Sequence, residues 1–238
     1  MKLTLLASAA LALALAPLSA SAAAPASTSP VGTWEVALAG ADQGTAYVTF
    51  EDDHDFTAYG LSRESLGLFT LSGTWTIDEA GQLVGSYTET INGGTVAGTL
   101  TGKLAPKSIT GSVAATNGNF TFKAKPEAVT QNLTGSWTGI ASVGKQRLPE
   151  LYQITPSALP HVYQIEGTGF SPLSGEYSIF GTILAGANGK VELLAFSMDA
   201  WGAPGFSTFR GTVNASRKQN VLKGNHSSGA PIKISLRR

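Results

Sequence analysis

The chain contains two copies of a segment of about one hundred residues, and this repeat limits the possible folds more than any other feature. Gly32-Thr33-Trp34 opens the first copy, and Gly135-Ser136-Trp137 opens the second at an offset of 103 residues. Further matches follow in the same order, pairing 47–50 with 152–155, 71–75 with 173–177, 109–111 with 222–224, and 120–124 with 232–236. The repeat predicts two domains, 32–126 and 135–238, joined by a linker over 127–134. A single larger barrel built from both copies is the alternative.

Within each copy, apolar and polar side chains alternate with a period of two. The clearest runs place apolar residues at Val96, Leu100 and Leu104 and at Ile232, Ile234 and Leu236. Such alternation is typical of antiparallel strands with one buried face, and turn residues recur every eight to twelve positions. We therefore predict an all-β protein whose two tandem repeats each form about eight short antiparallel strands, as an up-and-down barrel or a compact sandwich. Glycines at Gly98, Gly102 and Gly111 fall on the inward positions, where they favour a strongly curled sheet.

The first 22 residues have the pattern of an export signal. Lys2 supplies a positive start, an apolar run extends to Ala16, and Ala20-Ser21-Ala22 offers a small-residue cleavage site. The run is shorter than the roughly twenty apolar residues that a membrane span needs, so an uncleaved anchor is the less favoured alternative. We expect residues 1–22 to be removed, 23–31 to act as a linker, and the mature chain to be periplasmic or extracellular with no membrane span. The chain has no cysteine, which excludes disulfides and thiol catalysis.

Charge is sparse and unevenly divided between the two copies. Lysine and arginine balance aspartate and glutamate at 16 each, so nucleic-acid binding has no support. Residues 23–134 carry 5 bases and 11 acids, a net charge of −6, whereas 135–238 carry 10 bases and 5 acids, a net charge of +5. Opposite charge favours attraction between the repeats or self-association of neighbouring chains. Neutral drift on solvated faces explains the same numbers.

No motif for catalysis or for a cofactor is present. The segment Gly135-Ser136-Trp137-Thr138-Gly139 is similar to a nucleophile elbow, but its serine stands one place too early. Metalloprotease, Walker and dinucleotide-binding patterns are absent from the sequence. We expect neither enzymatic activity nor a cofactor, although the paired carboxylates of a glycosidase have no spacing that a sequence reveals.

The segment 51–55 is the densest cluster of charge, and Glu51, Asp53 and Asp55 are candidate calcium ligands. Its spacing does not match an EF-hand loop. The corresponding turn of the second copy, 156–161, contains no carboxylate. A solvated hairpin turn is therefore the favoured interpretation, with a calcium site as the alternative.

Trp201 and Phe206 are the candidate ligand-binding residues. They lie in the glycine- and proline-rich run 199–206, which has no clear counterpart in the first copy. An aromatic residue on such a loop is suited to contact a ligand or partner, and it is equally suited to fold back as an anchor of the loop. Trp34, Trp75 and Trp137 are instead predicted to be core residues.

The paired Gly-x-Trp openings carry a family resemblance. Gly32-Thr33-Trp34 and 133–138 around Trp137 resemble the first strand of calycin barrels, which include lipocalins, fatty-acid-binding proteins and avidins. The resemblance implies that each tryptophan plugs the closed end of an up-and-down barrel. It also implies a basic residue of the last strand covering that tryptophan, for which the candidates are Lys123, Lys125, Lys233 and Arg237.

Three functions remain open on this basis. The favoured one is an exported binding module that holds a small apolar ligand inside one or both barrels. The alternative is a structural or adhesive surface protein that acts by self-association or partner binding. An outer-membrane barrel shares the alternation, but Lys233 and Arg237 opposite the apolar face and the 236–238 ending argue against it.

Overall fold

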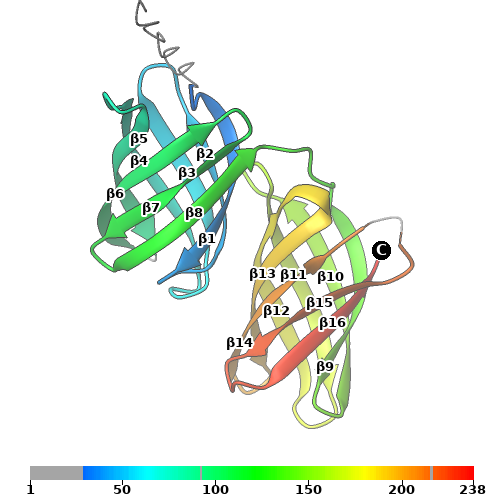
Figure 1. The fold of residues 1–238 in the computed structure, drawn as a ribbon. Coiled ribbons are helices and arrows are strands. Elements are labelled where there is room, and N and C mark those ends of the chain that lie inside the picture. Colours follow the sequence, from blue (N-terminus) through cyan, green and yellow to red (C-terminus); the bar gives the residue numbers. More distant parts are fainter. Residues whose placement is uncertain (1–28, 92, 215–216) are drawn as a thin grey trace, which may run out of the picture.

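The computed structural model describes residues 29–238 except 92 and 215–216, so the predicted signal segment 1–22 lies outside the described residues. Two closed antiparallel barrels follow one another along the chain (Figure 1). The first contains β1 (Gly32–Gly40), β2 (Gly44–Phe50), β3 (Asp55–Ser62), β4 (Gly67–Ile77), β5 (Gln82–Ile91), β6 (Gly94–Ala105), β7 (Ser108–Ala115) and β8 (Gly118–Pro126). The second contains β9 (Gly135–Val143), β10 (Gln146–Pro156), β11 (Val162–Ser171), β12 (Gly175–Ala185), the 3-10 turn η1 (Ala187–Gly189), β13 (Lys190–Asp199), β14 (Pro204–Thr212), β15 (Asn220–His226) and β16 (Pro231–Arg237).

Both barrels have up-and-down topology, which confirms the predicted fold class of two eight-strand antiparallel repeats. Within each barrel, strands that are consecutive in the sequence pair with each other, β8 closes on β1, and β16 closes on β9. The alternative of one larger barrel is therefore wrong, because each copy closes its own ring of hydrogen bonds. Among the described residues, no helix has the length and apolar character needed to cross a membrane.

Inward glycines allow the strands to curl tightly enough to close. A Cβ atom at Gly73 would lie 2.1 Å from the Ser86 carbonyl oxygen, and one at Gly181 would lie 2.1 Å from the Leu194 carbonyl oxygen. Both distances are too short for any side chain, so these two strand positions require glycine. A Cβ atom at Gly111, one of the glycines predicted to lie on an inward position, would stand 2.1 Å from the Thr101 carbonyl oxygen, so the prediction is confirmed there.

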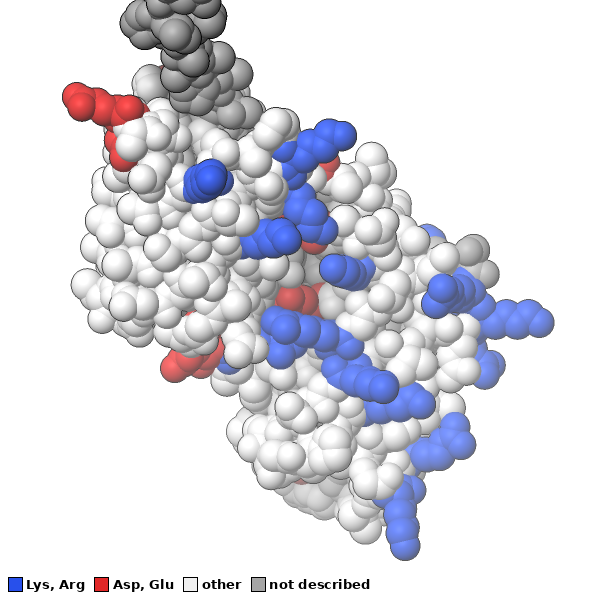
Figure 2. All heavy atoms as spheres, in the orientation of Figure 1, with Lys and Arg blue, Asp and Glu red and all other residues white. Residues whose placement is uncertain are grey.

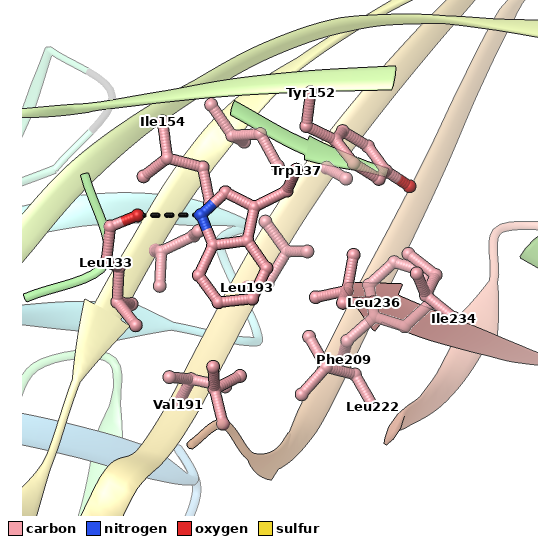
Figure 3. Packing of buried hydrophobic residues seen from close by; sticks show 14 of the residues in the cluster. Leu133, Trp137, Tyr152, Ile154, Val191, Leu193, Phe209, Leu222, Ile234 and Leu236 are labelled. Atoms are coloured by element: carbon pink, nitrogen blue, oxygen red, sulfur yellow. Dashed lines mark hydrogen bonds between the residues drawn. The ribbon is translucent and has the colours of Figure 1, made fainter. Parts of the chain in front are cut away.

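A buried tryptophan closes one end of each barrel in the same way. Nε1 of Trp34 donates a hydrogen bond of 2.7 Å to the Pro30 carbonyl oxygen, and Nε1 of Trp137 donates one of 2.8 Å to the Leu133 carbonyl oxygen. Figure 3 shows the second of these bonds, with the indole ring surrounded by aliphatic side chains of several strands. Because a buried indole N–H needs an acceptor, the chain just before each barrel is fixed against its closed end.

The basic residue that covers Trp137 is not one of those expected from the resemblance. The guanidinium carbon of Arg238 lies 5.9 Å from the centre of the Trp137 ring, and Nη2 of Arg238 donates a hydrogen bond of 2.7 Å to the Thr134 carbonyl oxygen. Lys233 and Arg237 stand within β16, whereas Arg238 follows the strand and can fold back over the end of the barrel. Within the described part of the first barrel, no cation lies over Trp34 in the same way.

The strand registers correct two of the matches drawn between the repeats. Trp34 stands opposite Val48, and Trp137 stands opposite Tyr152, so Tyr152 corresponds to Val48 rather than to Tyr47. The two tyrosines differ by one position, and a one-residue shift moves a side chain to the other face of the sheet. Following the ladder further, Tyr177 corresponds to Phe69 rather than to Trp75. Trp75 is nevertheless buried, as predicted.

The outer walls of the two barrels meet in a small apolar contact, which we call the junction. It contains Tyr47 and Leu61 from the first barrel and Val162, Leu184 and Leu194 from the second, all buried.

Polar bonds surround the apolar centre of the junction. The Tyr47 hydroxyl donates to the Ala185 carbonyl oxygen at 2.8 Å, and Oε2 of Glu35 accepts the Ala187 N–H at 3.0 Å. The Tyr47 ring also stacks on His161, with ring centres 4.3 Å apart. Burial raises the pKa of Tyr47 well above its usual value, with Glu35 adding to the effect, so the hydroxyl stays a donor.

Candidate ligand-binding cavities

Each barrel is closed at the tryptophan end and hollow toward the other end, which we call its mouth. The mouth of the first barrel is formed by the turns β1–β2, β3–β4, β5–β6 and β7–β8, and that of the second by the turns β9–β10, β11–β12, β13–β14 and β15–β16. Both mouths lie toward the lower part of Figure 1. Because consecutive strands run in opposite directions, alternate turns gather at the same end, and their residues line one opening.

The first barrel encloses cavity 1, with a volume of about 190 Å³. Its walls are aliphatic and aromatic, and they include Phe50, Phe56, Phe69, Leu100 and Val113 from five different strands. Polar side chains, including Asp42, Ser62, Glu64 and Asn117, line the mouth. An apolar interior with a few polar groups at one end is the usual form of a site for small organic molecules.

Tyr87 supplies the unusual group of cavity 1. Its ring lies against Gly98, where a Cβ atom would stand 2.5 Å from the ring, and its hydroxyl is buried without a hydrogen-bond partner among the described residues. Burial, with Glu89 adding to it, raises the pKa of Tyr87 to about 12. Burial also raises the pKa of Glu89, and Asp42 contributes. A buried hydroxyl without a partner costs free energy.

The second barrel encloses cavity 2, with a volume of about 290 Å³. Its apolar lining comes from Ile165, Ile179, Leu193 and Phe209 among others, and its polar lining includes Ser171, Ser207, Asp199 and His226. Both serines are buried, so polar groups line the interior of cavity 2 as well as its mouth.

Glu150 is the most unusual residue of cavity 2. Its side chain is buried, with the residue only 7% exposed, and it accepts hydrogen bonds from the hydroxyls of Tyr152 and Tyr177. The Tyr177 oxygen lies 2.7 Å from Oε1, and the Tyr152 hydroxyl donates to Oε2. Burial raises the pKa of Glu150, while the two tyrosine hydrogen bonds act in the opposite direction. We call these three residues the acid triad.

The two cavities carry their polar groups on different walls. The ladder aligns the acid triad with Ala46, Val48 and Phe69 of the first barrel, which are all apolar. Conversely, Tyr87 and Glu89 align with Ala195 and Ser197 of the second barrel. The two barrels therefore have the same strand topology but present different chemistry to a ligand.

Neither predicted binding aromatic lines a cavity. Trp201 lies in the β13–β14 turn at the mouth of the second barrel and is 75% exposed, while the Asp199 carboxylate accepts the Trp201 and Ala203 N–H groups. Phe206 belongs to strand β14 rather than to a loop, and its side chain points outward. It joins an outer row of three rings, since Phe196 lies 5.3 Å from Phe206 and 5.7 Å from Phe180 between ring centres.

The candidate calcium ligands lie in the β2–β3 turn at the closed end of the first barrel. Glu51, Asp53 and Asp55 are exposed, and Oδ1 of Asp53 accepts the Asp55 N–H at 3.1 Å. Within residues 29–238, gaps excepted, no three histidine or acidic side chains gather closely enough to hold a metal ion. The turn is organised by its own hydrogen bonds, including that between the His54 N–H and the Glu51 carbonyl oxygen.

The acid triad was missed in the sequence analysis. Leu148, Glu150, Tyr152 and Ile154 stand at every second position, so the alternation itself places Glu150 on the inward face of β10. The match of Tyr152 with Tyr47 implies that the Tyr152 side chain faces outward, because Tyr47 faces outward into the junction. An acidic residue in an otherwise apolar alternation was the available signal.

Comparisons with known proteins add little. No family model matches the chain, and no curated protein matches it. Among solved structures, a redesigned β-barrel, mFAP1, bound to DFHBI, is similar over 44% of this chain and 94% of its own length, at 16% identity and a TM-score of 0.39.

Proposed function

We propose that this protein is an exported, non-enzymatic carrier of small molecules, related in architecture to the calycins, and that cavity 1 holds an apolar ligand. The single observation that carries the proposal is cavity 1 itself, a space of about 190 Å³ inside the first barrel whose walls are aliphatic and aromatic. A site with apolar walls and a few polar groups at its mouth suits a mostly apolar molecule.

The size of cavity 1 limits the ligand. The volume lies below the roughly 300–1,000 Å³ of typical sites for drug-sized molecules. We therefore expect a compact molecule, such as a small aromatic ketone or aldehyde, rather than a long-chain lipid. The acidic mouth formed by Asp42, Glu64 and Glu89 disfavours anionic ligands.

The test combines native mass spectrometry of the mature protein, purified from its own host, with isothermal titration of a neutral probe, acetophenone, which is a compact aromatic ketone. Val113→Trp would place a large ring inside cavity 1, and Ser112→Trp would place the same ring on the outer face of β7. We expect Val113→Trp to abolish probe binding and Ser112→Trp to retain it, with both variants showing the wild-type far-UV spectrum. Equal binding by the two variants, or no binding by wild type, would exclude cavity 1 as the site.

Association with a second copy of the chain is a second candidate function. The outward row of Phe180, Phe196 and Phe206 on the second barrel favours it, together with the net charges of −6 and +5 on the two repeats. Figure 2 shows lysine and arginine side chains gathered over the visible face of the second barrel. Sedimentation velocity at low and high salt tests this candidate: a monomer at low salt contradicts it, and loss of a dimer in Phe196→Ser supports it.

A further inference from the structure

We propose that cavity 2 is a second, chemically distinct binding site, which takes a small organic cation with an apolar body, such as an aromatic primary amine, through the Glu150 carboxylate. The proposal extends the proposed carrier function to the second barrel, and it does not depend on what cavity 1 binds. Four observations lead to it.

The first observation is the isolation of the buried acid. Glu150 is 7% exposed, and the charged groups lining cavity 2 within the described residues are only Glu150, Asp199 and His226, with no lysine or arginine. Buried charges in proteins are normally paired. The second repeat nevertheless has a net charge of +5. None of its described lysines and arginines lines cavity 2.

The second observation is the hydrogen-bond capacity that the acid triad leaves unused. An ionised carboxylate offers about four acceptor sites, and Glu150 receives one hydroxyl from Tyr152 and one from Tyr177. Each oxygen therefore keeps a free lone pair. An ammonium group has three donors and no acceptor, so it matches what remains.

The third observation is that the acid triad is held in place by glycines. A Cβ at Gly139 would stand 2.6 Å from the Tyr152 ring, and one at Gly169 would stand 2.3 Å from the Tyr177 ring. Each tyrosine therefore occupies the space that a side chain would fill. The rings fix both hydroxyls on the carboxylate before any ligand arrives, which reduces the ordering cost of binding.

The fourth observation is the contrast with the first barrel. The three positions of the acid triad are Ala46, Val48 and Phe69 there. A carboxylate is therefore not needed to close or fill this kind of barrel. Its presence in cavity 2 alone points to a binding role, because a buried acid without a cation is destabilising.

The closed end supports an apolar body for the ligand. Between the acid triad and the closed end, the cavity is lined by Ile165, Ile179, Leu193 and Phe209. In Figure 3 the Tyr152 hydroxyl points away from Trp137. A molecule with its amine beside Glu150 would place its apolar part among these side chains. The volume of about 290 Å³ suits a molecule with a single ring system.

The experiment is isothermal titration of the full mature protein with phenethylamine and with 2-phenylethanol, which is nearly isosteric but uncharged. We expect the amine to bind at least tenfold more tightly than the alcohol. Glu150→Gln should remove that preference, and Glu166→Gln, which neutralises an exposed acid on the neighbouring strand β11, should keep it. Val113→Trp should leave amine binding unchanged, because it blocks only cavity 1.

Each opposite result overturns the proposal. Equal affinity for amine and alcohol, unchanged amine binding in Glu150→Gln, or no amine binding at millimolar concentration would show that the acid triad is purely structural. No acetophenone binding by the wild-type protein, with amine binding retained, would instead contradict cavity 1 alone. The two failures are therefore distinguishable.

Discussion

The Tyr47 hydroxyl of the first barrel donates a hydrogen bond of 2.8 Å to the Ala185 carbonyl oxygen of the second. Tyr47 is fully buried, and its ring also stacks on His161. This one side chain therefore contributes both packing and a directed bond to the junction, which orients the barrels relative to each other.

We predict that Tyr47→Phe weakens the junction while leaving each barrel folded. The substitution keeps the ring but leaves the Ala185 carbonyl without this donor, and a lost buried hydrogen bond costs about 1 kcal/mol. Chemical denaturation followed by the intrinsic fluorescence of the tryptophans should show lower stability or separation of the two transitions. Tyr59→Phe is the matched control, since Tyr59 packs at the same junction and, within the described residues, its hydroxyl donates no bond to the second barrel. An equal loss in both variants would contradict the role given to the Tyr47 bond.

Tyr87→Phe should stabilise the empty protein. The change removes a buried hydroxyl that has no partner among the described residues, and such a group costs roughly 1–3 kcal/mol. Thermal unfolding should therefore show a higher midpoint without ligand. A lower midpoint in the empty protein would show that water or a protein group satisfies the hydroxyl.

Gly169→Ala should disturb the acid triad through Tyr177. The added Cβ would approach the Tyr177 ring to 2.3 Å, and overpacking of this kind costs typically 1–3 kcal/mol. Gly102→Ala in the first barrel is a milder control, because its Cβ would meet the end of the Phe122 ring at 3.2 Å. Urea denaturation of the two variants should rank Gly169→Ala as the less stable. The reverse order would mean that Tyr177 can move without cost.

The contribution of Glu150 to the stability of the empty protein should fall as pH rises above about 4.5, the ordinary pKa of a glutamate. Burial raises the pKa of Glu150 in the folded state, so the folded protein holds this proton when the unfolded chain has lost it. The stabilisation is complete below the unfolded pKa and disappears as pH passes the folded pKa. The groups facing Glu150 are Tyr152 and Tyr177, with Asp199 and His226 also lining the cavity.

Glu150→Gln checks this prediction. The variant cannot ionise at this position, so the difference in unfolding free energy between variant and wild type should change with pH across this window. Glu89 also has a pKa raised by burial, and it contributes in the same direction in both proteins. A difference that stays constant between pH 4 and pH 8 would show that Glu150 ionises in the folded protein as it does in the unfolded chain.

Much of the fold was predictable because period-two alternation and the paired Trp34 and Trp137 are local signals. Alternation correctly placed Leu100 and Gly98 inside, and the repeat correctly divided the strands into two sets of eight. Register between the copies was less accessible, since it depends on hydrogen-bonded partners far apart in the chain. Pairing Tyr47 with Tyr152 by residue identity reversed the direction of one side chain, and Glu150 was overlooked for that reason.

The candidate site was harder to predict than the fold. The run of glycine and proline around Trp201 and Phe206 indicates an exposed binding loop, and neither residue lines cavity 2. Cavity 2 is instead formed by small numbers of residues from each strand, and closure of the barrel brings them together. No single segment of the sequence contains enough of that set to reveal it.

The tryptophan plugs give the molecule a direction. The described chain enters the first barrel beside Trp34, at the end opposite its mouth, and the mouth of the second barrel opens toward the same side (Figure 1). A surface or tether joined to the chain ahead of residue 29 would therefore lie behind the first barrel. Both mouths would then face away from that surface or tether, which would not block the entry of a small molecule into either cavity.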